Sequence, residues 1–160
     1  MHHQKLILFD FDGVIVNGID EYWFSSRLAC EKYLKTSLKY LDIDKYIKVP
    51  KIFVEIRPWV KYGWEMILLT HEILKIHKPL NNLTKNTFLE NYEENCLQLL
   101  SAYSWKSVEL QQYLDNARAY QIKNNFKKWI LLHQPFHEVV SFIRYAKEKD
   151  YKIGIISTKS

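Results

Sequence analysis

Two carboxylates, Asp10 and Asp12, are the residues whose type and spacing best suit chemistry, and they follow directly on an apolar run. Lys5 to Phe9 has the near-continuous apolar composition of a buried strand and no helical spacing. Burying an unpaired carboxylate is costly, so this strand must end where charge is needed. In open α/β sheets that place is the crevice at the carboxyl ends of the strands.

The spacing of the two carboxylates indicates a metal-assisted reaction. Two such groups leaving a strand together face one pocket, where they repel each other unless a cation lies between them. Mg²⁺ takes oxygen ligands and suits this arrangement. One carboxylate then attacks an electrophile while the other transfers a proton. Gly13 comes next, and its lack of a side chain allows a tight bend and a close approach by a ligand.

Other interpretations of the pair are weaker. An Asp-x-Asp pair also occurs in metal sites of nucleotide-sugar glycosyltransferases, but the strand context that such sites need is missing. A purely structural surface pair is a further alternative, and the apolar strand before Asp10 argues against it. A calcium loop of the EF-hand type needs more oxygen ligands after Gly13, and Val14, Ile15 and Val16 supply none from their side chains.

The stretch from Phe9 to Ile15, Phe-Asp-Phe-Asp-Gly-Val-Ile, closely resembles the first motif of the haloacid dehalogenase (HAD) superfamily. The resemblance implies that Asp10 is the nucleophile that becomes aspartyl-phosphate and that Asp12 is the general acid/base. It also implies that Asp10 and Asp12 bind Mg²⁺, the latter through its backbone carbonyl, with Gly13 beside the phosphate. The expected activity is hydrolysis of a phosphate ester on a small phosphorylated metabolite.

A second α/β unit closes the chain. Residues 136–149 have the spacing of an amphipathic helix, and Lys152 to Ile156 then read as a strand that ends in Ser157 and Thr158. If the two strands are parallel neighbours, these hydroxyls emerge at the same sheet edge as the carboxylates. This stretch resembles the second HAD motif, which implies that Ser157, or the adjacent Thr158, binds the transferring phosphoryl group.

Helical patterns fill the region between the two motifs. One helix is expected from a cap at Asp20 to about Thr36, and residues 55–58 open another that runs toward His77. In the HAD family an insertion at this point is a helical cap that closes over the site and selects substrate. The expected fold is therefore α/β: a Rossmann-like HAD core, incomplete with two parallel strands, formed by residues 1–17 and 134–160, with an all-α cap at 18–133.

Two cap residues are candidate substrate contacts. Arg57 and Glu65 lie near a helix start rich in tryptophan, and a guanidinium there can clamp an anionic group of the substrate. The competing interpretation is a solvated charge beside packed aromatic side chains.

Composition limits the class of partner. The net charge of +5 comes from basic residues dispersed among acidic ones, whereas a nucleic-acid face needs them clustered; an RNA-binding helical module remains a third hypothesis. Cys30 and Cys96 lie in helical patterns, which favours reduced thiols in a cytoplasmic protein. The N-terminus has no signal-peptide pattern, and no apolar run is long enough to span a membrane. The oligomeric state is open.

The family pattern has two further motifs, a later Lys or Arg and a later acidic pair, and neither follows Ser157 in these 160 residues. Two strands alone also leave both sheet edges bare. We therefore expect a truncated part of a longer hydrolase that is inactive by itself. The alternative is a catalytically inactive HAD-like remnant or binding module.

Overall fold

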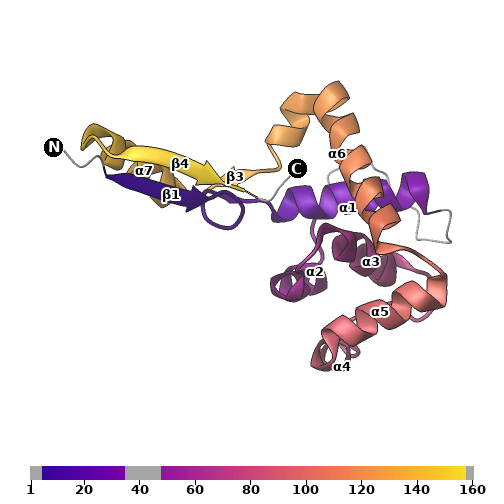
Figure 1. Ribbon diagram of the computed structural model, residues 1–160. Helices are drawn as coiled ribbons and strands as arrows, with labels where there is room; N and C mark the ends of the chain where they lie inside the picture. The colour runs from indigo at the N-terminus through magenta and orange to yellow at the C-terminus, as the bar shows by residue number, and fades with distance from the viewer. Residues whose placement is uncertain (1–4, 35–47, 158–160) are drawn as a thin grey trace.

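The computed structural model describes residues 5–34 and 48–157, which form a mixed α/β and mostly helical chain. A small sheet with one covering helix lies at one end, and the remaining helices gather at the other (Figure 1). Both long strands run toward the helices, so their carboxyl ends face the helical part.

The sheet consists of β1 (Leu6–Asp10) and β4 (Lys152–Ile156), which pair in parallel. Their register joins Leu6 to Lys152 at one end and Asp10 to Ile156 at the other. The predicted strands are therefore confirmed as parallel neighbours. A complete Rossmann core is a finer statement that two strands do not establish.

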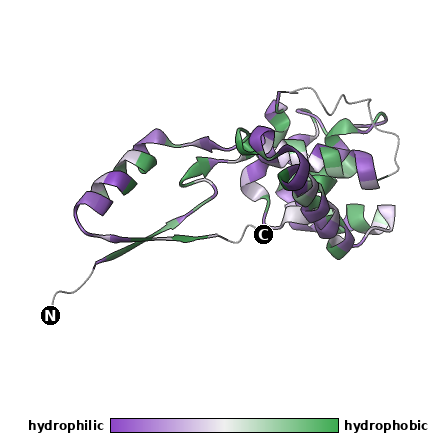
Figure 2. Ribbon diagram, turned by 90° about the horizontal axis from the view of Figure 1, so that it is seen from above, coloured by the Kyte–Doolittle hydropathy of each residue, from purple (hydrophilic) through white to green (hydrophobic). Residues whose placement is uncertain are grey.

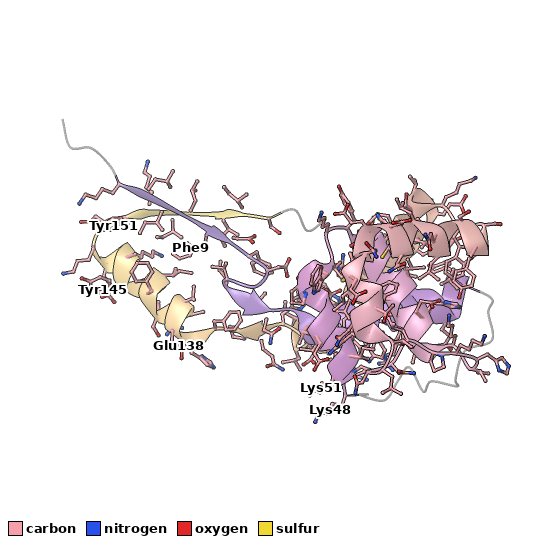
Figure 3. All side chains as sticks on the ribbon, turned by 90° about the horizontal axis from the view of Figure 1, so that it is seen from below. Phe9, Lys48, Lys51, Glu138, Tyr145 and Tyr151 are labelled. Carbon is pink, nitrogen blue, oxygen red and sulfur yellow. The ribbon has the colours of Figure 1, made fainter. Side chains whose placement is uncertain are left out.

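Helix α7 (His137–Glu148) covers one face of this sheet. Phe9 is buried beneath it, with Val139 and Ile143 packed against the cluster and the ring of Phe142 at 6.2 Å edge to face (Figure 3). Apolar residues make up most of both strands (Figure 2). On the face away from α7, Leu6, Leu8 and Ile156 are more than half exposed.

A short antiparallel pair joins the sheet to the helices. β2 (Val16–Asn17) pairs with β3 (Gln134–Pro135), so the two chain crossings between the parts lie side by side. No sequence pattern predicts this pair, because each strand has only two residues. The predicted boundaries at 17 and 134 fall within it, and the division into core and cap stays a prediction.

The helical part has a hydrophobic core of its own, formed mainly where α1, α3 and α6 pack together. Its fully buried side chains include Trp23, Phe53, Ile67, Leu68 and Leu114. Its elements are α1 (Ile19–Tyr33), α2 (Lys51–Ile56), the 3₁₀ turn η1 (Arg57–Trp59), α3 (Gly63–Leu74), α4 (Lys85–Glu90), α5 (Tyr92–Tyr103) and α6 (Ser107–Ile130).

The start of α1 differs from the prediction. Gly18, not Asp20, is the N-cap of α1, and the Asn17 side chain accepts the Ile19 amide at 3.1 Å. Asp20 lies in the first turn, where a carboxylate also suits the helix dipole, and it accepts a hydrogen bond from Gln134 of β3 at 2.8 Å.

The single helix expected from residues 55–58 to His77 is wrong. Pro58 lies in η1, after α2 has ended, and the backbone is extended at Val60 and Tyr62. A new helix then starts at Gly63, because the Glu65 carboxylate accepts the amides of Lys61 and Tyr62. The break places Arg57 and Lys61 on a turn between helices.

A buried ion pair fixes α1 against α6. Glu21 is fully buried, and its carboxylate accepts the Arg118 Nε at 2.9 Å and Nη2 at 3.2 Å. Ser25, one turn along α1, also donates to Glu21, at 2.6 Å. Burying both charges is costly, so each depends on the other. None of the helices within 5–34 and 48–157 has the length and apolar character needed to cross a membrane.

Replacing Arg118 should therefore destabilise the fold strongly. Arg118→Met leaves the Glu21 carboxylate buried without its cation, and we expect a loss of about 3–5 kcal/mol in the free energy of unfolding, measured by urea denaturation. Adding Glu21→Gln to this variant should recover part of the loss. Lys51→Met is the control, because its ion pair with Glu55 is exposed and screened by solvent. A loss no larger than that of the control would contradict the assigned role.

Candidate active site

A tight turn carries the chain out of β1 and presents the two carboxylates. The Phe11 carbonyl accepts the amides of Ile15 at 3.0 Å and Val16 at 3.1 Å, and the Gly13 amide donates to the Val16 carbonyl at 2.8 Å. Gly13 has φ of +80°, a conformation that side chains disfavour. Its amide is committed to the turn, so Gly13 shapes the loop instead of offering a donor to a phosphate.

The Asp10 carboxylate is exposed and partly oriented by its own backbone. One oxygen, Oδ1, accepts the Phe11 amide at 2.7 Å. Asp10 therefore offers an accessible oxygen at the end of the strand.

Asp12 contacts the first turn of α1. The Tyr22 hydroxyl donates to the Asp12 carboxylate; burial raises the pKa of this phenol, and the bond and charge of Asp12 raise it further. Gly18 lies against both groups, since a Cβ there would meet Tyr22 Cζ at 3.1 Å and Asp12 Oδ1 at 3.2 Å. The absence of a side chain at residue 18 lets the core loop and α1 meet.

Both carboxylates line a cavity of about 250 Å³ between the end of β1 and the helices. The helical lining comes from α1, from η1 and the turn after it, from the start of α3, and from α6. Its members are Tyr22, Arg57, Val60, Lys61, Tyr62, Gly63, Met66, Gln111 and Arg118. A second, more open hollow of about 630 Å³ adjoins it at Lys61 and Gln111. The fold thus brings Arg57 to the predicted carboxylate site.

The lining combines two anionic side chains with three cationic ones. Arg118 is held by Glu21 in the buried pair, and Lys61 forms an exposed ion pair with Glu93. Arg57 is half-buried, with its guanidinium carbon 4.6 Å from the centre of the Tyr22 ring. An anionic ligand in this cavity would meet positive charge opposite the carboxylates.

The remaining predicted site residues lie in different places. Ser157 is exposed and directly follows Ile156, the partner of Asp10 in the sheet register, so it leaves the sheet at the same edge as the carboxylates. It is not part of the cavity lining. Thr158 lies outside the described residues.

Glu65 does not line the cavity and is only 4% exposed. Its Oε2 accepts the Lys61 amide at 2.8 Å and the Tyr92 hydroxyl at 3.0 Å. Its position supports the turn that carries Arg57 and Lys61, and we leave it out of the proposed substrate contacts.

The donor set at Asp10 and Asp12 is compatible with Mg²⁺. This ion is commonly held by one or two carboxylates and a substrate phosphate, and it keeps several water ligands. Over residues 5–34 and 48–157, no cluster of three or more His, Cys, Asp and Glu side chains is arranged for a metal. The two aspartates are therefore the carboxylate donors that the cavity offers.

Sequence reasoning missed Tyr22, Gln111 and Arg118 as cavity residues. A signal existed for Arg118, which shares helical spacing with the buried Leu114 and Ala117; a charge on such an apolar face indicates a buried partner. Tyr22 had no comparable signal, because its contact with Asp12 depends on how α1 meets the loop.

Comparisons of the chain with models of known protein families, with curated proteins and with solved structures found no match. The assignment of a function therefore depends on the residues and their geometry.

The turn at Gly13 gives a stability prediction. Gly13→Ala meets open space but must adopt a left-handed backbone, and we expect it to cost about 1–2 kcal/mol in the free energy of unfolding. Gly13→Asn should cost less, because asparagine adopts this conformation more readily. Equal losses for the two variants in urea denaturation would contradict a backbone cause.

The hydrogen bonds that Glu65 accepts lead to a second stability prediction. Glu65→Ala leaves two backbone amides and a buried phenol without their acceptor, and it should lower the free energy of unfolding by about 1–3 kcal/mol. Glu65→Gln keeps an acceptor oxygen and should recover most of this loss. If Glu65→Ala left the unfolding curve unchanged but weakened ligand binding, Glu65 would belong among the substrate contacts.

Proposed function

We propose that the protein is a Mg²⁺-dependent phosphate-ester hydrolase of the HAD type that acts through an aspartyl-phosphate intermediate on a small phosphorylated substrate. The observation that carries this proposal is the shared cavity. Asp10 and Asp12 face it from the end of β1, and three cationic side chains face it from the helical part. Anion binding and carboxylate chemistry thus meet at one place.

Asp10 has the features of a nucleophile. Its Oδ1 is held by the Phe11 amide, which leaves the other oxygen to attack phosphorus. The new bond joins this oxygen to phosphorus, and the ester P–O bond breaks with its electron pair passing to the leaving oxygen. The product of this step is an aspartyl-phosphate and an alcohol.

Asp12 supplies and recovers the proton. It gives a proton to the leaving oxygen in the first step and then takes one from the water that attacks the aspartyl-phosphate. The second step releases inorganic phosphate and restores the Asp10 carboxylate. The hydrogen bond from Tyr22 orients Asp12 for both transfers, because it fixes the carboxylate against α1.

Asp10 and Asp12 are the residues that would hold Mg²⁺. When bound, this ion offsets the repulsion between the carboxylates and the phosphoryl group. Ser157 is proposed to contact phosphoryl oxygens, because its place after Ile156 brings it to the strand end that carries Asp10.

The test is to trap the intermediate. A protein containing these residues, incubated with Mg²⁺ and labelled phosphate monoesters, should acquire an acid-stable label that hydroxylamine removes. Asp10→Asn should abolish the label and lower the rate of phosphate release at least a thousandfold, because the nucleophile is lost.

Asp150→Asn is the matched control. Asp150 lies at the opposite end of the sheet, before Lys152, and its positive φ of 59° suits asparagine. It should keep both label and release. Phosphate release that survives Asp10→Asn would reject Asp10 as the nucleophile, and ligand binding without label or release would favour the inactive binding module.

A further inference from the structure

Arg57 is distinguished among the cations of the cavity by its lack of an acidic partner. Lys61 is paired with Glu93, and Arg118 with Glu21. Across the described parts of the chain, Arg57 forms no salt bridge. Its charge is therefore available to a ligand.

The guanidinium of Arg57 is held in place before any ligand arrives. It stacks over the Tyr22 ring, and its Nη1 donates to the Val60 carbonyl at 3.5 Å. Its Nε is buried and has no hydrogen-bond partner among the described residues. The neighbouring Pro58 stiffens the turn that carries it. A guanidinium that is positioned before the ligand arrives binds a carboxylate at a small entropic cost.

The position of Arg57 relative to Asp12 indicates which part of a substrate it meets. Tyr22 contacts both Asp12 and Arg57: its hydroxyl donates to Asp12, and the guanidinium carbon of Arg57 lies 4.6 Å from the centre of its ring. Asp12 must reach the leaving oxygen of the ester, and Arg57 lies one side chain away from Asp12. It is therefore placed to contact the leaving group, a few bonds from phosphorus.

We propose, as an inference that rests on the proposed hydrolase function, that the leaving group carries a carboxylate and that Arg57 binds it. The substrate class is a short phosphorylated hydroxy acid. Its planar carboxylate matches the guanidinium fork. The cavity of about 250 Å³ lies below the range of about 300–1,000 Å³ that drug-sized ligands occupy, which suits so compact an acid.

The competing role for Arg57 is a contact with the transferring phosphoryl group. The two roles differ in what they predict for a ligand without the carboxylate. A phosphoryl contact affects every phosphate ester alike, whereas a leaving-group contact affects the acid alone.

The experiment compares 3-phosphoglycerate with glycerol 3-phosphate, which differ only in carboxylate against hydroxymethyl. Affinities are measured by calorimetry with Mg²⁺ in the Asp10→Asn background, so that turnover does not consume either ligand. We expect the acid to bind at least tenfold more tightly, because a hydrogen-bonded charge pair contributes that much. Arg57→Gln should abolish the preference and change the affinity for glycerol 3-phosphate less than threefold.

Two further variants keep the result interpretable. Lys61→Gln is the matched control, since it removes another cation from the same lining, and it should retain the preference. Arg57→Lys keeps the charge but loses the fork, and it should retain only part of the preference. An unfolding curve for each variant shows that its fold is intact.

Equal affinities for the two ligands, no binding of either, or an equal loss of both in Arg57→Gln would overturn the inference. These outcomes are separate from the fate of the hydrolase proposal. An Arg57-dependent preference without any hydrolysis would preserve the ligand class and reject the enzyme, while equal hydrolysis of both esters would reject the ligand class alone.

Discussion

Two like charges at the end of one apolar strand are the constraint on which the rest of the structure depends. β1 buries Phe9 under α7, and one residue later it must release Asp10 into a place where charge is tolerated. The left-handed Gly13 turns the chain so that Asp12 reaches the same cavity. The guanidinium of Arg57 lies in the same cavity, on the side of the helical part, and supplies the opposite charge.

The link between sheet and helices is made by few, specific contacts. Tyr22 reaches Asp12 from the first helical turn, and Asp20 accepts Gln134 from β3. Tyr22 and Asp20 both lie on α1, so the geometry of the site depends on how firmly that helix is held. The buried pair between Glu21 and Arg118 supplies this, because neither charge can leave its partner without a large desolvation penalty. The ion pair thus acts on the carboxylates through the helix that carries Tyr22.

Sequence reasoning succeeded where the signal was local. The strands Leu6–Asp10 and Lys152–Ile156 and their parallel pairing followed from apolar runs, an intervening amphipathic helix and polar residues at the strand ends. It failed where a contact spans the chain. Glu21 and Arg118 are 97 residues apart, and the break before α3 depends on a glutamate side chain that caps backbone amides. Secondary-structure propensity predicts neither the ion pair nor the break, because tertiary packing decides both.

In the proposed hydrolase, the two parts have separate tasks, with the chemistry in one and the selection of the ligand in the other. The carboxylates depend on β1 and its turn, whereas the cationic lining depends on η1, the start of α3 and α6. A substitution at Arg57 removes a contact with the Tyr22 ring but leaves the hydrogen bond between Tyr22 and Asp12. Changes in the helical lining can therefore alter which ligand is held while the geometry of Asp10 and Asp12 stays the same.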